Sequence, residues 1–243
     1  MKAQDRKALR AFPNREAAGR ALAGELTKRR LIDPVVLALP RGGVPVAVEI
    51  AKTLRAPLDL VLVRKIGVPF QPELAAAAVV DGGQPEIVIN EDVISLAGLD
   101  RDYIDQEAKR ELAEIERRRQ AYLGGRPRVP LEGRTLIVVD DGIATGASVR
   151  AALKALRRRG PKALVLAVPV APADTVEALR AEVDQLICLA TPEPFYAIGL
   201  HYLDFRQLSD QEVVSSLAAI ESKAAAKPDE GESVEAAASR PVG

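Results

Sequence analysis

Leu-Ile-Val-Val-Asp-Asp-Gly-Ile-Ala-Thr-Gly-Ala-Ser, residues 136–148, is the most informative part of the chain. Its four aliphatic residues, three of them β-branched, are typical of a strand buried on both faces. Two adjacent carboxylates, Asp140 and Asp141, end this strand, and a loop of small residues then leads into a helix. Open α/β sheets bind their ligands at the carboxyl ends of their strands. The stretch therefore predicts an α/β fold with a ligand site at residues 140–148.

The loop after the two carboxylates is suited to hold a phosphate group. Its side chains are small enough for a phosphate to reach the backbone N–H groups, and the following helix would point its positive end at the anion. Thr145 and Ser148 add hydroxyl donors. Acids beside such a loop suit a sugar phosphate, with the vicinal hydroxyls on the acids and the 5′-phosphate in the loop. The alternative is a tight strand-to-helix turn whose acids only cap the helix.

The same thirteen residues resemble the phosphoribosyl-diphosphate (PRPP) loop of type I phosphoribosyltransferases, in which an apolar strand precedes Asp-Asp/Glu-x-x-x-Thr-Gly-x-Ser/Thr. The resemblance implies an α/β fold, with a mostly parallel twisted sheet flanked by helices, a small hood and a helical insertion. It also implies that this loop binds PRPP. The implied PRPP-binding residues are Asp140, Asp141, Gly142, Ala144, Thr145, Gly146, Ala147 and Ser148.

A second candidate anion loop, Pro40-Arg41-Gly42-Gly43, follows a predicted strand and opens a helix. Its glycines let the backbone approach a ligand closely or adopt a positive φ. Arg41 offers a planar fork of donors that matches phosphate oxygens. In the resembled family this position holds the pyrophosphate-binding loop, often with a strained peptide bond, so the resemblance implies PRPP binding by all four residues. Arg-Gly-Gly also occurs in ordinary turns.

Two cations, Arg64 and Lys65, follow the predicted strand 58–63 and are expected to face the same crevice as Arg41. The segment resembles the Val-Arg-Lys-x-Gly-x-Pro of adenine-type phosphoribosyltransferases. Residues 64–73 also resemble a group of bacterial proteins assigned to phosphoribosyltransferases. The resemblance implies that both cations bind PRPP and that Lys65 closes over the pyrophosphate. The alternative is an exposed basic turn.

Four of the eight aromatic residues lie within residues 193–208. This segment resembles the hood over the base in purine phosphoribosyltransferases. The resemblance implies that Phe195 or Tyr196 stacks on a base, a contact that contributes about 1–3 kcal/mol in other base-binding sites. The alternative is that these aromatics only attach the hood to the core. His201 is the single histidine and is expected to be a surface or packing residue rather than a general base.

The implied reaction displaces pyrophosphate from PRPP by a nitrogen nucleophile, with Mg²⁺ as the cofactor and a small-molecule acceptor, expected to be a nucleobase. The implied catalytic residues are Asp140, Asp141, Arg41 and Lys65. Asp140 and Asp141 would hold the ribose hydroxyls and contact the metal through those hydroxyls or water. Ala144 stands where transferases for 6-oxopurines carry an acid, which argues against hypoxanthine and guanine. Type I enzymes are commonly dimers, so a homodimer is expected.

A regulatory protein of the same fold, which senses PRPP or nucleotides without turnover, is the alternative function. Such proteins keep the phosphate loop but tend to lose the pyrophosphate loop or its cations. Because Arg41, Arg64 and Lys65 are all present, the sequence favours an enzyme.

Apolar segments alternate along the chain in a βα rhythm, which predicts a mostly parallel sheet with helices on both faces. The expected strands are 35–39, 58–63, 74–80, 87–89, 135–140, 163–170 and 184–189, and the expected helices are about 15–30, 44–54, 91–123, 146–159 and 172–182. We expect one domain over residues 1–221, with a helical insertion at about 91–127 and a hood from the N-terminal segment and about 190–210. Residues 222–243 are poor in large apolar side chains and are predicted to be disordered.

Composition limits the partners of the chain. Lys+Arg and Asp+Glu both number 34, so no global basic field favours nucleic acid. The basic runs 117–119 and 157–159 lie on predicted helices and are expected to be solvated. The single cysteine, Cys188, excludes an internal disulfide framework and a cysteine-based zinc site. The charged N-terminus and the absence of a long apolar run predict a cytoplasmic protein with no membrane contact.

Overall fold

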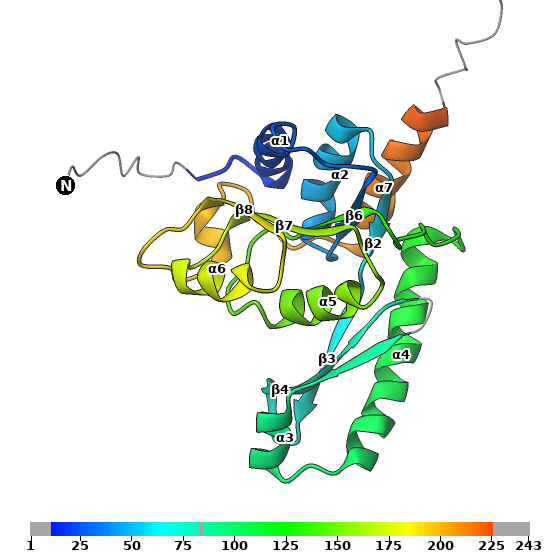
Figure 1. Ribbon diagram of the computed structural model, residues 1–243, viewed down its shortest axis with the longest axis vertical. Helices are drawn as coiled ribbons and strands as arrows, with labels where there is room; N and C mark the ends of the chain where they lie inside the picture. The colour runs from blue at the N-terminus through cyan, green and yellow to red at the C-terminus, as the bar shows by residue number, and fades with distance from the viewer. Residues whose placement is uncertain (1–10, 83–84, 226–243) are drawn as a thin grey trace, which may run out of the picture.

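The computed structural model describes residues 11–82 and 85–225, and its centre is a five-stranded parallel sheet (Figure 1). The strand order is β2-β1-β6-β7-β8. The bounds are β1 Pro34–Ala38, β2 Leu58–Leu60, β6 Thr135–Val139, β7 Ala163–Val170 and β8 Gln185–Ala190. Strand β6, which precedes the two acids, is buried along its whole length between β1 and β7. The predicted core strand at residues 136–139 is therefore confirmed.

Helices cover both faces of this sheet. Helices α1 (Arg15–Leu26), α2 (Gly43–Leu54) and α7 (Asp210–Ala225) lie on one face, and α5 (Ala147–Arg157) and α6 (Ala173–Arg180) lie on the other (Figure 1). Alternate residues of β6 point to opposite faces, so that Ile137 packs with α2 and Leu136 with α5. The predicted α/β architecture, a mostly parallel sheet flanked by helices, is confirmed.

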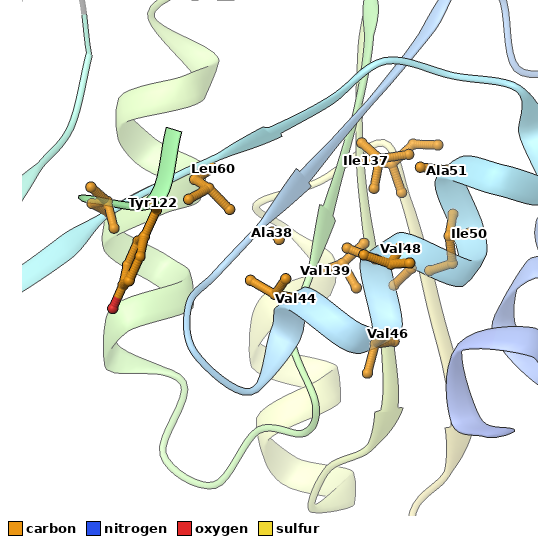
Figure 2. Packing of buried hydrophobic residues seen from close by; sticks show 14 of the residues in the cluster. Ala38, Val44, Val46, Val48, Ile50, Ala51, Leu60, Tyr122, Ile137 and Val139 are labelled. Atoms are coloured by element: carbon orange, nitrogen blue, oxygen red, sulfur yellow. The ribbon is translucent and has the colours of Figure 1, made fainter. Parts of the chain in front are cut away.

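Helix α2 fixes the second anion loop against the sheet. Its Val44, Val48 and Ala51 pack with Ile137 and Val139 of β6, as Figure 2 shows. Each fully buried valine or isoleucine side chain stabilises the fold by about 1.5–3 kcal/mol relative to an exposed one. Because α2 begins at Gly43, directly after the Pro-Arg-Gly turn, this packing places that turn beside the carboxyl end of β6.

The segment after β2 differs from the expected single sheet. Three strands, β3 (Val63–Val68), β4 (Gln71–Val80) and β5 (Glu86–Ile89), form a separate antiparallel sheet in the order β3-β4-β5. The expected strand 58–63 is divided, since the parallel sheet keeps only Leu58–Leu60. This smaller sheet extends away from the core in Figure 1. The prediction of an edge strand at 87–89 is confirmed, but the edge belongs to the smaller sheet.

The predicted helical insertion consists of α3 (Glu91–Ala97) and α4 (Arg101–Leu123). The apolar stripe of α4, which includes Ile104, Ala108 and Ile115, packs against Ile66 and Val79 of the antiparallel sheet. Helix α4 therefore supports the smaller sheet along its length and returns the chain to the core.

The last helix extends past the predicted end of the domain at residue 221. Helix α7 continues to Ala225, so residues 222–225 of the predicted tail are helical, and 226–243 lie outside the described residues. Within residues 11–82 and 85–225, no helix is both long enough and apolar enough to cross a membrane.

The expectation of a solvated basic face at 117–119 is wrong for Arg119. This side chain is 6% exposed and lies between two buried acids. Its Nη2 donates to Asp59 Oδ1 at 3.0 Å, and its Nη1 donates to Asp81 Oδ2 at 2.8 Å. Arg119 thus joins α4 to β2 and to the end of β4. Sequence could not reveal it, because both partners are distant in the chain.

Replacing Arg119 by methionine is expected to lower the free energy of unfolding by about 3–5 kcal/mol, because the buried Asp59 would lose its cation and the buried Asp81 would keep only Arg128. Urea denaturation measures this loss. Arg117→Met is the matched control: Arg117 is on the same helix, pairs with Glu114 and is 61% exposed, so its removal is expected to cost about 1 kcal/mol or less. Equal losses for both variants would contradict the importance of the buried pair.

Candidate functional site

The predicted loops meet at the carboxyl end of β6. Asp140 is half-buried, and its Oδ1 accepts a hydrogen bond from the backbone N–H of Asp141 at 2.8 Å. It lines a cavity of about 130 Å³ together with residues from four other segments. The lining residues are Leu39, Pro40, Val61, Leu62, Val63, Arg64, Ile115, Arg118, Asp140 and Ser148. One cavity therefore joins an acid at the strand end, the Pro-Arg-Gly-Gly turn and the phosphate-type loop, by which we mean residues 144–148.

The two acids differ in their surroundings. Burial raises the pKa of Asp140 well above its usual range, and the neighbouring Asp141 raises it further. Burial also raises the pKa of Asp141, while Arg15 acts in the opposite direction. Arg15 Nε donates to Asp141 Oδ2 at 2.7 Å, and both side chains are buried. Asp141 is thus held by a cation from α1, and Asp140 is the acid that faces the cavity.

The glycines of the second anion loop allow close packing against the end of β6. Gly42 has φ −60°, so no left-handed conformation is needed. A Cβ atom at Gly42 would lie 2.0 Å from Asp141 Oδ2, and one at Gly43 would lie 2.6 Å from the carbonyl oxygen of Val139. The glycines therefore let this loop lie against the end of β6. The Pro40–Arg41 peptide bond is cis.

Arg41 points toward the start of α7. Its Nη1 lies 3.6 Å from Asp210 Oδ1, and its side chain remains 37% exposed. Asp210 also accepts a hydrogen bond from the Tyr122 hydroxyl at 2.7 Å. Burial and this hydrogen bond raise the pKa of Tyr122 to about 12, so the phenol stays protonated as a donor. Arg41 follows Pro40, which lines the cavity, and its long, partly exposed contact with Asp210 is a weak ion pair.

The phosphate-type loop is open to solvent. Gly146 has φ +75° and is the N-cap of α5, so the loop turns there directly into the helix. Ala144, Thr145 and Ala147 are exposed, and Ser148 is half-buried. The first backbone N–H groups of a helix lack intrahelical acceptors. This arrangement places unpaired donors and the positive helix end beside two hydroxyl groups, as expected for an anion site.

Gly142 lies on the buried side of that loop. A Cβ atom there would lie 2.5 Å from Ile198 Cγ2, so the hood packs directly against this glycine. The structure thus places Gly142 under the hood rather than on the open surface of the loop.

Arg64 and Lys65 line different hollows, so the expectation that both face the crevice of Arg41 is wrong for Lys65. Both lie within β3, where neighbouring side chains point to opposite faces. Arg64 faces α4, donates from Nε to Glu111 Oε2 at 2.5 Å and lines the cavity with Asp140. Lys65 is exposed and lines a groove of about 450 Å³ that includes Thr145 and Lys154. Arg64 therefore belongs to the acid side of the site, and Lys65 to the phosphate-loop side.

Residues 195–205, part of the segment expected to form the hood, contact the N-terminal segment. Phe12 forms an isolated parallel bridge with Tyr202, whose ring is stacked on Phe205 at 4.9 Å. The rings of Phe195 and His201 are stacked with their centroids 5.3 Å apart, and Phe195 also packs against the core. These contacts favour attachment to the core for Phe195. Tyr196, by contrast, is 78% exposed and keeps its ring free.

His201 takes the expected packing position. Its Nε2 is buried without a hydrogen-bond partner, and burial lowers its pKa. The neutral imidazole is therefore favoured beneath Phe195.

Sequence reasoning missed two basic residues of the site, Arg15 and Arg118. Arg15 is the first residue of α1, and Arg118 is on α4 with its Nε donating to Glu114 at 2.6 Å. Arg118 lines the cavity with Asp140. No local pattern distinguishes either residue, because each reaches the site only through the packing of distant helices.

The acids at the end of β6 are the candidate ligands for Mg²⁺. Among the described residues, no group of three or more His, Cys, Asp or Glu side chains could hold a metal ion. Mg²⁺ is usually bound through one or two carboxylates together with substrate phosphates and several waters. The two adjacent acids beside two anion loops fit this mode of binding.

A family model described as the phosphoribosyl transferase domain matches residues 5–203. A Mycobacterium tuberculosis (strain H37Rv) protein named "Putative phosphoribosyl transferase Rv0571c" is 47% identical over 209 residues, which cover 86% of this chain. A protein of the CDC 1551 strain, named with the same activity, matches equally well. The chain spans about half the length of these curated relatives, since the matches cover 47% of them.

One solved structure has a similar fold. The crystal structure of TT1426 from Thermus thermophilus has a TM-score of 0.75 and 43% sequence identity, and the alignment covers 85% of this chain and 97% of that one. By its matched residues and its relatives, the chain belongs to the phosphoribosyl transferase domain family.

Proposed function

We propose that this chain transfers the 5-phosphoribosyl group of Mg²⁺-PRPP to a nitrogen acceptor and releases pyrophosphate. The observation that carries the proposal is the shared cavity of Asp140, Pro40 and Ser148. It brings an acid for ribose hydroxyls next to both anion loops. The M. tuberculosis relatives are named as phosphoribosyl transferases, which agrees with the group transferred.

Asp140 has the central role in this reaction. Its carboxylate accepts hydrogen bonds from ribose hydroxyls and places negative charge beside a ribose that becomes cationic as the bond to pyrophosphate breaks. A hydrogen bond to a charged group contributes about 1.5–3 kcal/mol. Only the increase in this hydrogen-bond free energy between the bound substrate and the transition state accelerates the reaction.

The loops position the two ends of PRPP. Residues 144–148 bind the 5′-phosphate through backbone N–H groups and hydroxyls, with Lys65 beside them across the groove. The turn at Pro40–Gly43 and the cations Arg41 and Arg64 bind the pyrophosphate. Bound Mg²⁺ supplies charge neutralisation for the leaving group. Fixing both ends of the donor supplies catalysis mainly by orientation.

A nucleobase is the acceptor that the hood favours. Tyr196 presents a free aromatic face, and base stacking contributes about 1–3 kcal/mol in other proteins. Phe195 is already stacked on His201, so Tyr196 is the better candidate for the stacking residue. The methyl group of Ala144 offers no acid to a 6-oxopurine, which favours adenine-type or other acceptors.

Calorimetry with Mg²⁺-PRPP, followed by a screen of nucleobases for pyrophosphate release in the same preparation, tests the proposal. Binding together with release for one base is the expected result and identifies the acceptor. Binding without release for any base would favour a PRPP-sensing protein. A lack of PRPP binding would contradict both functions.

A further inference from the structure

Arg15 is a buried cation that the proposed reaction does not yet use. It is 8% exposed, although it begins the first helix of the described chain. Its Nε donates to Asp141 Oδ2 at 2.7 Å, across 126 residues of sequence. Burying a guanidinium is costly unless it is paired and hydrogen-bonded. The contact therefore represents a built feature of the site rather than a surface ion pair.

The hood holds Arg15 independently of Asp141. The guanidinium carbon lies 4.0 Å from the centroid of the Phe205 ring, which is within cation–π distance. Arg15 Nη1 also donates to the carbonyl oxygen of Arg206 at 3.0 Å. Since two contacts fix the guanidinium from the hood side, its orientation does not depend on the acid that it binds.

Asp141, in turn, is confined on several sides. The Tyr202 hydroxyl donates to its carbonyl oxygen at 2.5 Å, and the space for its carboxylate exists only because Gly42 lacks a Cβ atom. Arg15 is the strong donor to the side chain itself. Without Arg15, the carboxylate would lose its charge-assisted hydrogen bond and the partner that sets its rotation.

From this geometry we infer that Arg15 is a positioning residue for PRPP, which acts by orienting the carboxylate of Asp141 toward the ribose. The inference rests on the proposed function, since it gives Asp141 a ribose hydroxyl to bind. Arg15 also connects the hood, where the acceptor would bind, to the acid that would bind the ribose. Phe205 and the carbonyl oxygen of Arg206 contact the guanidinium group that binds Asp141. Asp140 and Asp141 thus have different supports, one from its own strand end and one from α1 and the hood.

The test is a double-mutant cycle on Mg²⁺-PRPP affinity measured by calorimetry. Arg15→Met keeps the aliphatic stem and is expected to weaken binding by about 10- to 100-fold. In an Asp141→Asn background the same change is expected to weaken binding less than about threefold, because the residue through which Arg15 acts is already altered. Arg15→Lys is expected to recover part of the loss.

Two further variants keep the test interpretable. Arg20→Met is the matched control, because Arg20 is on the same helix and its exposed side chain contacts Glu49 at 3.5 Å. The affinity of this variant for Mg²⁺-PRPP is expected to equal that of the wild type. Phe205→Leu removes the ring over the guanidinium and is expected to give a smaller loss than Arg15→Met. This variant serves where Arg15→Met does not fold.

The outcomes separate the inference from the proposed function. Wild-type affinity in Arg15→Met, or equal losses in both Asp141 backgrounds, would overturn the inference while leaving PRPP binding intact. A wild-type protein that does not bind Mg²⁺-PRPP would overturn the proposed function and the inference with it. Where Arg15→Met does not fold, wild-type affinity in Phe205→Leu would overturn the inference.

Discussion

Asp140→Asn is expected to lower kcat/KM for Mg²⁺-PRPP by about 100-fold or more. Asparagine keeps the shape and one acceptor but removes the charge, so a hydrogen bond of about 1.5–3 kcal/mol to the ribose is weakened. The negative charge that opposes the developing cation is lost as well. Steady-state kinetics of pyrophosphate release measure the loss, with kcat expected to fall because the charge matters most in the transition state.

The same variant is expected to keep or raise the free energy of unfolding. Burial raises the pKa of Asp140, which means that the folded state disfavours its ionised form. With a folded pKa above the unfolded value, this group lowers stability as the pH rises between the two values, and asparagine removes that effect. Asp105→Asn, in an exposed pair on α4, is the activity control. Wild-type turnover in Asp140→Asn would remove Asp140 from the mechanism.

Because Asp140 and Asp141 have different contacts, we expect the loss of Asp141 to lower the free energy of unfolding more than the loss of Asp140. Asp141→Ala would leave Arg15 buried without its anion, whereas Asp140 has no ion pair within 4.0 Å among the described residues. Sequence treats Asp140 and Asp141 as equivalent, because they are adjacent and identical. Only the position of α1, set by helix packing on α2 and the hood, separates them.

The core of the fold could be predicted because its signals are local. Strands β1, β6 and β7 are continuous apolar runs, and each is followed by a helix with apolar residues on one face. A βα rhythm then permits few topologies. The anion loops were predictable for the same reason, since each follows such a strand directly.

The antiparallel sheet was not predictable from these signals. Residues 60–63 are all apolar, so no polar break marks the bend between β2 and β3. Strands were expected at 74–80 and 87–89, but the run Ala75–Ala78 gives no alternation of apolar and polar residues that would indicate their antiparallel pairing in a separate sheet. Arg64 and Lys65 were expected in a loop after strand 58–63. Because they lie within β3 instead, their side chains point to opposite faces of the sheet.

Thr145→Asp is expected to weaken Mg²⁺-PRPP binding by about a thousandfold and to abolish turnover at ordinary substrate concentrations. Thr145 is exposed at the turn before Gly146, and in the proposed function the first amides of α5 and the Ser148 hydroxyl bind the 5′-phosphate there. A carboxylate about 4 Å from the phosphate would cost about 4 kcal/mol at the effective dielectric constant of a protein surface. Calorimetry measures the dissociation constant directly.

Two comparisons show whether charge is the cause. Thr145→Val removes the hydroxyl without adding charge and is expected to weaken binding by about tenfold or less. Thr53→Asp adds the same charge near the far end of α2 and is expected to leave PRPP affinity unchanged. Repulsion at an exposed position is screened by salt, so the loss in Thr145→Asp should shrink as the ionic strength rises. An unchanged dissociation constant in Thr145→Asp would show that the 5′-phosphate binds elsewhere. An equal loss in Thr145→Val would show that the hydroxyl group, and not the helix end, dominates the contact.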